Sequence, residues 1–346
     1  MKPFLSIVVP CRNEGRFIAR CLDSILQGDY PADRMEVLMI DGQSADGTRE
    51  LIQQYAAKDP RVRLIDNPEQ ITPCALNHGL DEARGEIIAR IDGHAEAPPY
   101  YFRRLVEMLL ESGADNVGGL MCAVPQDAGL FAEPIVAALS TRFGVGGAHY
   151  RFPGNAPREV DTVWGGCWRR EVFDRIGRFN TALRRSQDIE FNRRLAAAGG
   201  RLLFVPDIKF DYFARSRMGI FWRHNFINGE WSVLPLLYSH VMPVCARHLT
   251  PLAFVAALVL GVALTPWTPW LLLAVAVPYV LANIAASVQV AIQKKRPQYL
   301  LLMPIVFLSL HLAYGLGSLK GLCKLAASWR STRAARIEEN ACLPQS

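Results

Sequence analysis

The sequence predicts an α/β domain followed by apolar helices of membrane length, and three observations support this prediction. Short apolar runs alternate with amphipathic helical patterns through the front of the 346-residue chain. One apolar run ends in the triplet Asp92-Gly93-His94, and polar residues follow other runs in the same way. The C-terminal third holds apolar stretches of about 20 residues. The alternation is typical of a mostly parallel sheet with helices on both faces.

Each element of the first half has its own signal. Four short runs rich in Val, Ile and Leu are typical of buried strands: residues 5–10, 36–40, 62–65 and 86–91. Helices are expected between them, where apolar side chains recur at helical spacing: residues 16–26, a helix carrying Leu51, Ile52 and Tyr55, and residues 72–83. Asp46 is the expected N-cap of the second helix.

The second half of the domain is less regular. Residues 117–124 predict a strand, 130–143 a helix, and the Gly- and Pro-rich segment 144–159 a loop. We then expect a strand over 160–164, a turn at Gly165-Gly166, helices over 169–176 and 186–198, and an edge strand over 202–205. The predicted domain therefore covers residues 1–214.

The rest of the chain predicts membrane contact. Segment 215–247 combines aromatic, basic and proline residues, which is typical of a helix at the headgroup level. Residues 248–320 hold three apolar stretches, 249–266, 270–292 and 299–319, with interfacial tryptophans in the turn after the first. A third full span would place the basic tail, 321–346, outside the cell, so two or three spans both remain open.

Composition narrows the classes of function. The net charge is +6, and its clusters, such as residues 294–296, lie beside apolar segments, so anionic lipids are expected partners and nucleic acid is not. The eight cysteines show no C-x-x-C pair and are expected to be reduced thiols. A strand that begins at residue 5 leaves no room for a signal peptide, which predicts a cytoplasmic front domain. Two or three apolar helices are too few for a transporter built from inverted repeats.

Polar side chains gather where the predicted strands end. Glu14, Asp41, Asp46, Asp92 and His94 all follow apolar runs. Ligands bind beyond the carboxyl ends of parallel strands, so these residues predict a single site. Asp92 and His94 are candidate ligands of a divalent cation or a diphosphate.

Two further groups have alternative interpretations. Asp188 opens a predicted helix, where it is either a general base or part of an ordinary salt-bridged first turn, and spacing alone does not decide. The segment Trp164-Gly165-Gly166 is either an acceptor platform or a plain tight turn.

Several motifs in order resemble the family 2 inverting glycosyltransferases of GT-A fold. They are Ser-Ile-Val-Val-Pro-Cys-Arg-Asn-Glu14, Ile-Asp41-Gly-Gln-Ser-Ala-Asp46-Gly-Thr, Ala75-Leu-Asn77-His-Gly79, Asp92-Gly-His94 and Gln187-Asp188. Arg90-Ile-Asp-Gly-His-Ala95 and Val160-Asp-Thr-Val-Trp-Gly-Gly166 resemble the ExoA-type enzymes of succinoglycan assembly.

This resemblance implies roles for individual residues. The donor would be a UDP-hexose, with UDP-glucose as the main candidate. It would be held by Pro10, Arg12, Glu14, Asp41, Ser44, Asn77 and Asp92. Asp92 and His94 would hold Mg²⁺ or Mn²⁺, and Asp188 would be the base of an inverting transfer. Trp164, Gly165, Gly166 and Gln187 would bind the acceptor. His94 departs from the family, which usually has a second Asp there, and the Gln-x-x-Arg-Trp signature of processive synthases is not found in the sequence.

The expected protein is a metal-dependent hexosyltransferase of the bacterial inner membrane whose catalytic domain faces the cytoplasm. It would add one sugar to a polyprenyl-diphosphate-linked acceptor in exopolysaccharide biosynthesis. The alternatives are a polyprenyl-phosphate hexose synthase and a non-catalytic scaffold that binds nucleotide-sugar at the membrane. No feature of the sequence indicates an oligomeric state.

Overall fold

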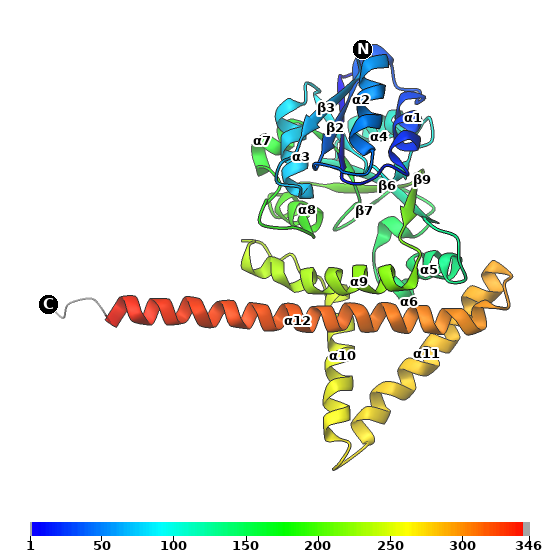
Figure 1. The fold of residues 1–346 in the computed structure, drawn as a ribbon, viewed down its shortest axis with the longest axis vertical. Helices are drawn as coiled ribbons and strands as arrows, with labels where there is room; N and C mark the ends of the chain where they lie inside the picture. Colours follow the sequence, from blue (N-terminus) through cyan, green and yellow to red (C-terminus); the bar gives the residue numbers. More distant parts are fainter. Residues whose placement is uncertain (1, 342–346) are drawn as a thin grey trace. The chain divides into compact units, whose positions relative to one another are not determined.

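A computed structural model describes the backbone of residues 2–341, and the side chains of these residues except 246–247 and 329–341. The chain forms two compact units (Figure 1). The first unit comprises residues 1–128 and 139–215, and the second unit comprises residues 129–138 and 216–346. Each unit has its own packing and is described by itself.

The first unit is built on a mixed sheet. Its parallel part contains β1 (Leu5–Cys11), β2 (Met35–Asp41), β3 (Val62–Asp66) and β4 (Ile87–Arg90), in the order β3-β2-β1-β4. The sheet continues through β8 (Gly166–Arg169), β6 (Asn116–Pro125), β9 (Leu202–Ala214) and β5 (Ala95–Glu96). The short β7 (Arg158–Glu159) pairs with β9. The expected fold class is confirmed, but the parallel arrangement holds mainly for the first four strands, because β8 runs antiparallel to both of its neighbours.

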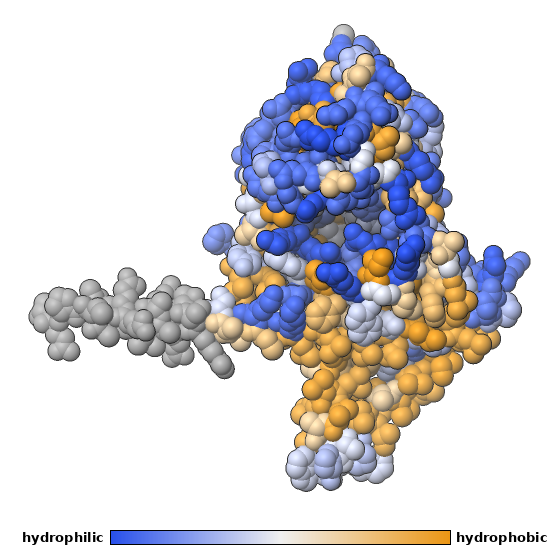
Figure 2. All heavy atoms as spheres, in the orientation of Figure 1, coloured by the Kyte–Doolittle hydropathy of each residue, from blue (hydrophilic) through white to orange (hydrophobic). Residues whose placement is uncertain are grey.

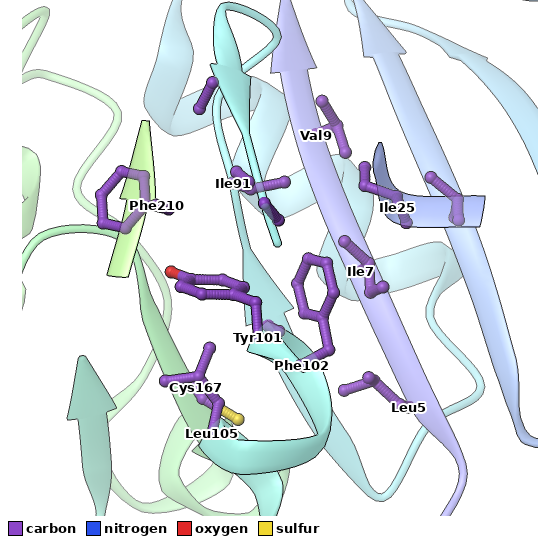
Figure 3. Packing of buried hydrophobic residues seen from close by; sticks show 14 of the residues in the cluster. Leu5, Ile7, Val9, Ile25, Ile91, Tyr101, Phe102, Leu105, Cys167 and Phe210 are labelled. Atoms are coloured by element: carbon purple, nitrogen blue, oxygen red, sulfur yellow. The ribbon is translucent and has the colours of Figure 1, made fainter. Parts of the chain in front are cut away.

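Helices cover both faces of this sheet. They are α1 (Ile18–Leu26), α2 (Thr48–Lys58), α3 (Thr72–Glu82), α4 (Tyr101–Ser112), α7 (Glu171–Ile176) and α8 (Gln187–Ala197). The unit also contains the short α6 (Arg142–Val145) and 3₁₀ turns at Ala32–Arg34 and His149–Arg151. Successive side chains of β1 point to opposite faces, so Ile7 packs in one apolar cluster and Val8 in the other. Figure 3 shows the first cluster, in which Ile7 and Phe102 lie between the sheet and α4.

The first half of the chain follows the predicted elements closely. The four predicted strands correspond to β1 to β4, and the three predicted helices to α1, α2 and α3. The N-cap position of α2 is Gly47, with φ +90°, rather than Asp46. Asp46 still accepts a bond from the backbone N–H of Thr48 at 3.2 Å, so it stabilises the helix start from one residue earlier.

The predicted elements of the second half need correction. Residues 160–164 form no strand; β8 begins only at Gly166, after the turn that the two glycines make. The helix expected over 130–143 is divided into α5 (Ala132–Leu139) and α6, because the hydroxyl of Thr141 accepts the N–H of Gly144 and starts a new helix. The expected loop 144–159 includes the end of α6, a 3₁₀ turn and β7.

The strand predicted over 202–205 is confirmed as the start of β9, but its expected length and edge position are wrong, because β9 runs to Ala214 and pairs with β5, β6 and β7. Asp207, Lys209 and Asp211 are its exposed residues, and they alternate with buried apolar ones. These charges interrupt the apolar run that marked the strand in the sequence. A register shift against β6 between Gly119 and Leu120 accompanies them.

The second unit is helical. It contains α5, α9 (Met218–Val233), a 3₁₀ turn at Leu234–Leu237, α10 (Ala246–Leu264), α11 (Trp270–Lys294) and α12 (Tyr299–Ala341). Among the described residues, α11 and the part of α12 over Tyr299–Ser328 are long and apolar enough to cross a membrane, and the apolar helix His248–Leu264 is shorter. Figure 1 shows α9 alongside α12, and α10 and α11 projecting from α12 as a hairpin. The expected tail 321–346 is helical to residue 341, and residues 342–346 lie outside the described part.

The cysteines agree with the expectation of reduced thiols. The seven cysteines among the described residues are all free, and Cys342 lies outside them. Burial raises the pKa of the Cys21 and Cys167 thiols, which keeps them protonated at neutral pH.

We expect Phe191→Ala to destabilise the first unit strongly. Phe191 is fully buried and stacks on Phe179 with ring centroids 4.7 Å apart. A buried Phe→Ala change costs about 3–5 kcal/mol, which corresponds to a melting temperature lower by roughly 6–20 °C in a domain of this size. Thermal melting of the full chain in detergent measures the shift. The control is Leu110→Ala on α4, at a half-exposed position, and equal shifts for the two variants would contradict the assignment of Phe191 to the core.

Candidate active site

The loops that follow β1 and β2 are held together by hydrogen bonds. The backbone N–H groups of Asn13, Glu14 and Gly15 donate to side chains of the second loop, at distances of 2.8 to 3.0 Å. The acceptors are the Ser44 hydroxyl, the Thr48 hydroxyl and the Asp46 carboxylate. In return, the Asn13 amide oxygen accepts the N–H of Ala45 at 3.0 Å. The two loops therefore form one rigid rim at the carboxyl end of the sheet.

Asp41 lies under this rim. Its side chain has no exposed surface, and its carboxylate accepts the Ser44 hydroxyl at 2.5 Å and pairs with Arg49 at 3.3 Å. Arg49 also pairs with Asp66, which is the register partner of Asp41 on β3. The described contacts thus give Asp41 the task of holding the loop, and a nucleoside would reach its carboxylate only by displacing Ser44 or Arg49.

Glu14 and His94 come together from segments 80 residues apart. His94 Nδ1 lies 2.9 Å from Glu14 Oε1, and the imidazole makes an edge contact with Tyr212. Burial alone would lower the pKa of His94. Tyr212, Glu14 and Asp92 together have a larger, opposite effect and raise this pKa to about 10. In the absence of a bound cation, the His94 imidazole is therefore protonated at neutral pH and lies in hydrogen-bond contact with Glu14.

Arg90 links the two acids on which the predicted chemistry depends. It is 3% exposed at the end of β4, and its guanidinium donates to Asp92 Oδ1 from Nε at 3.1 Å and from Nη2 at 3.0 Å. Its Nη1 donates to the carboxylate of Asp188 in the first turn of α8. The structure thus brings Asp92 and Asp188 to opposite sides of one buried cation.

The electrostatics of this group follow from burial. Burial raises the pKa of Asp188, Asp92 adds to the rise, and Arg90 opposes it. Arg90 lies between the two carboxylates, so its positive charge offsets part of their mutual repulsion. The sequence analysis missed Arg90. The sequence names Arg90 within a motif but carries no sign of its contacts, because Asp92 lies beyond the end of β4 and Asp188 is 98 positions away.

The predicted acceptor residues flank this group. Trp164 stacks on Phe210 with centroids 4.7 Å apart, and the Arg90 guanidinium lies 5.9 Å from the centre of the Trp164 ring. Gly165 and Gly166 have φ values of +65° and +125°, and a Cβ on Gly165 would lie 3.0 Å from the Arg90 carbonyl oxygen. A tight turn against β4 accounts for the first glycine, and an acceptor role for both remains a prediction. Gln187, beside Asp188, is buried.

The remaining donor candidates differ in their surroundings. Pro10 lies in β1 opposite Ile40, and Arg12 is exposed in the loop. Asn77 is bonded elsewhere: its amide donates to the Phe179 carbonyl at 2.9 Å and accepts the Phe179 N–H at 3.0 Å. Donor binding by Asn77 would have to replace these two bonds, which join α3 to the chain before α8.

Asp92 and His94 fit a divalent cation that a substrate helps to hold. Within residues 2–341 as described, no group of three or more His, Cys, Asp and Glu side chains is arranged to hold a metal. The bonds of Asp92 to Arg90 use Oδ1 and the bond of His94 to Glu14 uses Nδ1, so Oδ2 and Nε2 are the donor atoms that a cation would take. A carboxylate that orients a histidine through its other nitrogen is a common support for metal ligands. Mg²⁺ sites often use one or two protein ligands and take the rest from phosphates and water.

Comparison with known proteins gives a consistent result. A family model described as Glycosyl transferase family 2 matches residues 6–177. The succinoglycan biosynthesis protein ExoA of Rhizobium meliloti is 30% identical over 314 residues, which cover 90% of this chain and 92% of that protein. A dolichyl N-acetyl-α-D-glucosaminyl phosphate 3-β-D-2,3-diacetamido-2,3-dideoxy-β-D-glucuronosyltransferase of Methanococcus voltae is 25% identical and covers 93% and 98% of the two chains.

A solved structure has the same fold. The mannosyltransferase PcManGT from Pyrobaculum calidifontis, solved with GDP-Man and Mn²⁺, superimposes with a TM-score of 0.57 over 93% of this chain and 88% of that one. The sequences are 20% identical, so this likeness shows the fold alone.

We expect the Glu14–His94 pair to make stability depend on pH. The folded-state pKa of His94 is raised, so its stabilisation is complete below the ordinary histidine pKa of about 6.5 and is lost as the pH rises to about 10. The melting temperature of the wild-type chain should therefore fall relative to that of His94→Gln across this range. Melting in a pH series with a chelator present measures the difference, and His78→Gln, which removes an imidazole outside the site, is the control. A wild-type advantage that stays constant with pH would contradict the pairing.

Proposed function

This chain belongs to glycosyltransferase family 2, and on that premise we propose that it moves one hexose from a UDP-sugar, UDP-glucose first, to a polyprenyl-diphosphate-linked sugar. The product would be an intermediate of exopolysaccharide assembly. The relative named for succinoglycan biosynthesis supports this setting, because the two chains match over nearly their whole lengths. The dolichyl-phosphate-linked sugar in the name of the archaeal relative supports a lipid-linked acceptor.

The observation that carries the proposal is the group formed by Asp92, Arg90 and Asp188. Asp92 follows a strand at the nucleotide-binding end of the sheet, and Asp188 opens a helix next to the Trp164 segment. A transferase needs one charged group at the leaving diphosphate and another at the attacking hydroxyl. Because Arg90 bonds to both groups at once, it fixes their positions relative to each other, which also argues against the non-catalytic scaffold.

We assign the proton transfer to Asp188. Its carboxylate accepts the proton of the acceptor hydroxyl while that oxygen bonds to the anomeric carbon of the donor. The bond from this carbon to the diphosphate oxygen breaks, UDP leaves with the electron pair, and the configuration is inverted. The raised pKa of Asp188 makes it a better base than an exposed aspartate, provided that the pH is high enough to keep it ionised.

We propose that Asp92 and His94 hold Mg²⁺ or Mn²⁺ together with the donor. When bound, such a cation offsets the negative charge of the diphosphate and of the departing UDP. Glu14 would orient the His94 ring, and Arg90 would orient the Asp92 carboxylate. Because the protein supplies only these two ligands, we expect the cation and the donor to bind together.

The rim formed by the β1 and β2 loops would hold the nucleoside. Arg12 is exposed on the first loop and Glu14 is partly exposed, and Ser44 is partly exposed on the second loop. Pro10 and Asp41 would support the rim from below, and Asn77 would contribute only after leaving Phe179. On the acceptor side, Trp164, Gly165, Gly166 and Gln187 would line the approach to Asp188.

We also propose that the second unit anchors the enzyme in the bacterial inner membrane, with the first unit in the cytoplasm. The apolar helices α11 and α12 support membrane association. A bilayer anchor would place the site where a polyprenyl carrier presents its sugar.

Transfer assays with the purified chain in detergent test the proposed function. UDP-glucose, other UDP-hexoses and GDP-mannose are offered with lipid-linked acceptors, and nucleotide release and products are measured by mass spectrometry. The proposal predicts UDP release and a lipid carrying two sugars. A lipid phosphate carrying a single sugar would favour the polyprenyl-phosphate hexose synthase, and binding without turnover would favour the scaffold.

We expect Asp188→Asn to lower kcat by about 10²–10⁴-fold with donor binding nearly unchanged, because the amide cannot accept the proton. Asp92→Ala should weaken cation-dependent UDP binding as well as turnover. Calorimetry with UDP and the cation, together with initial rates, separates the two effects. The control is Asp174→Asn, an exposed acid on α7. Near-wild-type transfer by Asp188→Asn would support the helix-capping interpretation and make Glu190 the next candidate.

Arg90→Lys should keep the fold but lose catalysis. A lysine keeps the positive charge between the two acids and loses the fork that bonds to both. We expect kcat to fall by about 10²-fold, because small misplacements of catalytic groups have effects of this size. The donor KM should change less. Rates and melting temperatures are compared with those of Arg178→Lys, a partly exposed arginine paired with Asp81. Wild-type kcat in Arg90→Lys would show that the two acids do not depend on Arg90 for their positions.

A further inference from the structure

The α10–α11 hairpin presents an apolar surface to its surroundings. Its large exposed side chains are aliphatic along both helices: Val259, Leu260, Val262, Leu273, Val277, Val280, Leu281, Ile284, Val288 and Ile292. Two polar side chains of α11 turn inward instead, since Asn283 donates to the Pro304 carbonyl of α12 and Ser287 to that of Asn283. Figure 2 shows this surface as one continuous hydrophobic region. Polar groups inside and apolar groups outside are the pattern of a helix pair in lipid.

The dimensions of the hairpin match a bilayer. The apolar part of α10, His248–Leu264, has 17 residues and α11 has 25, which at 1.5 Å per residue gives about 26 and 38 Å against a hydrocarbon core of about 30 Å. The turn between them carries Trp267 and Trp270, both largely exposed, with threonine and proline. The tip is pale blue and white in Figure 2, in contrast to the shafts. Tryptophans beside polar residues are typical of the membrane–water interface, so the tip belongs at the far surface of the membrane.

The third apolar helix, α12, packs closely against α9. A Cβ on Gly229 of α9 would run into the Tyr314 backbone, and a Cβ on Gly317 of α12 into the Phe226 backbone. Ser318 donates to the Gly229 carbonyl at 3.1 Å. Backbones this close cannot separate without opening unfilled space, so α9 and α12 behave as one element.

Charge adds to this contact. Glu230 of α9 is 6% exposed and pairs with Lys320 at 3.0 Å and Lys324 at 2.5 Å, both on α12. Arg223 on α9 is exposed. Placing this pair of helices across a bilayer would bring these charges into hydrocarbon, at a cost of several kcal/mol.

The position of α9 follows from the chain. Only residues 215–217 separate the end of β9 from the start of α9, too few to cross a membrane. α9 is therefore on the side of the membrane that holds the first unit, and α12 must be there with it.

We propose that this protein crosses the bilayer twice, through α10 and α11, and that α12 lies along the membrane surface beside α9. The partner of the hairpin is the lipid bilayer. The first unit, the basic cluster 294–296 and Lys320 with Lys324 then share one side, as the distribution of basic residues around bacterial spans requires. This inference rests on the membrane association proposed above and is independent of the reaction.

Cysteine labelling tests this topology in the full-length protein. The background carries Cys122→Ser, Cys245→Ser and Cys342→Ser and keeps the exposed Cys323 of α12. Thr268→Cys is added at the tip in a second version that also carries Cys323→Ser. A third version carries Lys295→Cys with Cys323→Ser and reports on the turn between α11 and α12. A membrane-impermeant maleimide is applied to spheroplasts of each version before and after permeabilisation. Because labelling needs no activity, a failed transfer assay leaves this result unaffected.

The expected result is labelling of Thr268→Cys in intact spheroplasts, and of Cys323 and Lys295→Cys only after permeabilisation. Labelling of Cys323 in intact spheroplasts would overturn the proposal in favour of a third span. A Thr268→Cys thiol that stays unlabelled until permeabilisation, or throughout, would also overturn it, because the hairpin would then stop short of the far surface. The background with Cys323→Ser and no added cysteine keeps only the buried thiols, so any label that it takes up is subtracted.

Discussion

The site of this protein depends on a buried cation shared by two acids. Arg90 is the last residue of β4, whose other residues are apolar, and its guanidinium forms ion pairs with both Asp92 and Asp188. A guanidinium without surface exposure would be very costly alone, and two carboxylates without it would repel each other. Each group is therefore tolerable only because the other two are present. β4 and α8 are joined through this group, so the distance between Asp92 and Asp188 is set by a side chain and not by loops.

Much of the first half of the fold could be predicted from the sequence because it is encoded locally. Continuous apolar runs marked β1 to β4, and the polar residues after them marked one edge of the sheet. The second half was harder because tertiary contacts override local pattern there. β9 carries charges at alternate positions and still lies inside the sheet, and β8 begins at a glycine whose conformation no propensity indicates.

The sequence could predict which residues belong to the candidate site, but not which of their side chains contact each other. The sequence placed Glu14, Asp92, His94 and Asp188 near a common edge. It could not show that Glu14 meets His94, or that an arginine lies between the two aspartates, because these contacts join residues 80 and 98 positions apart. Asn77 illustrates the same limit. It stands in a motif typical of donor binding, yet its amide is bonded to the backbone of a residue 102 positions away.

The hydrogen bonds of the rim have a consequence for how relatives of this protein can diverge. The first loop is held through its backbone N–H groups and through one amide, that of Asn13, whereas the side chain of Arg12 points to the exterior. A substitution at residue 12 therefore alters the chemistry offered to a ligand and removes no bond that shapes the loop. If the donor binds at this rim as proposed, variation at residue 12 could change donor preference while the hydrogen bonds that shape the loop stay in place.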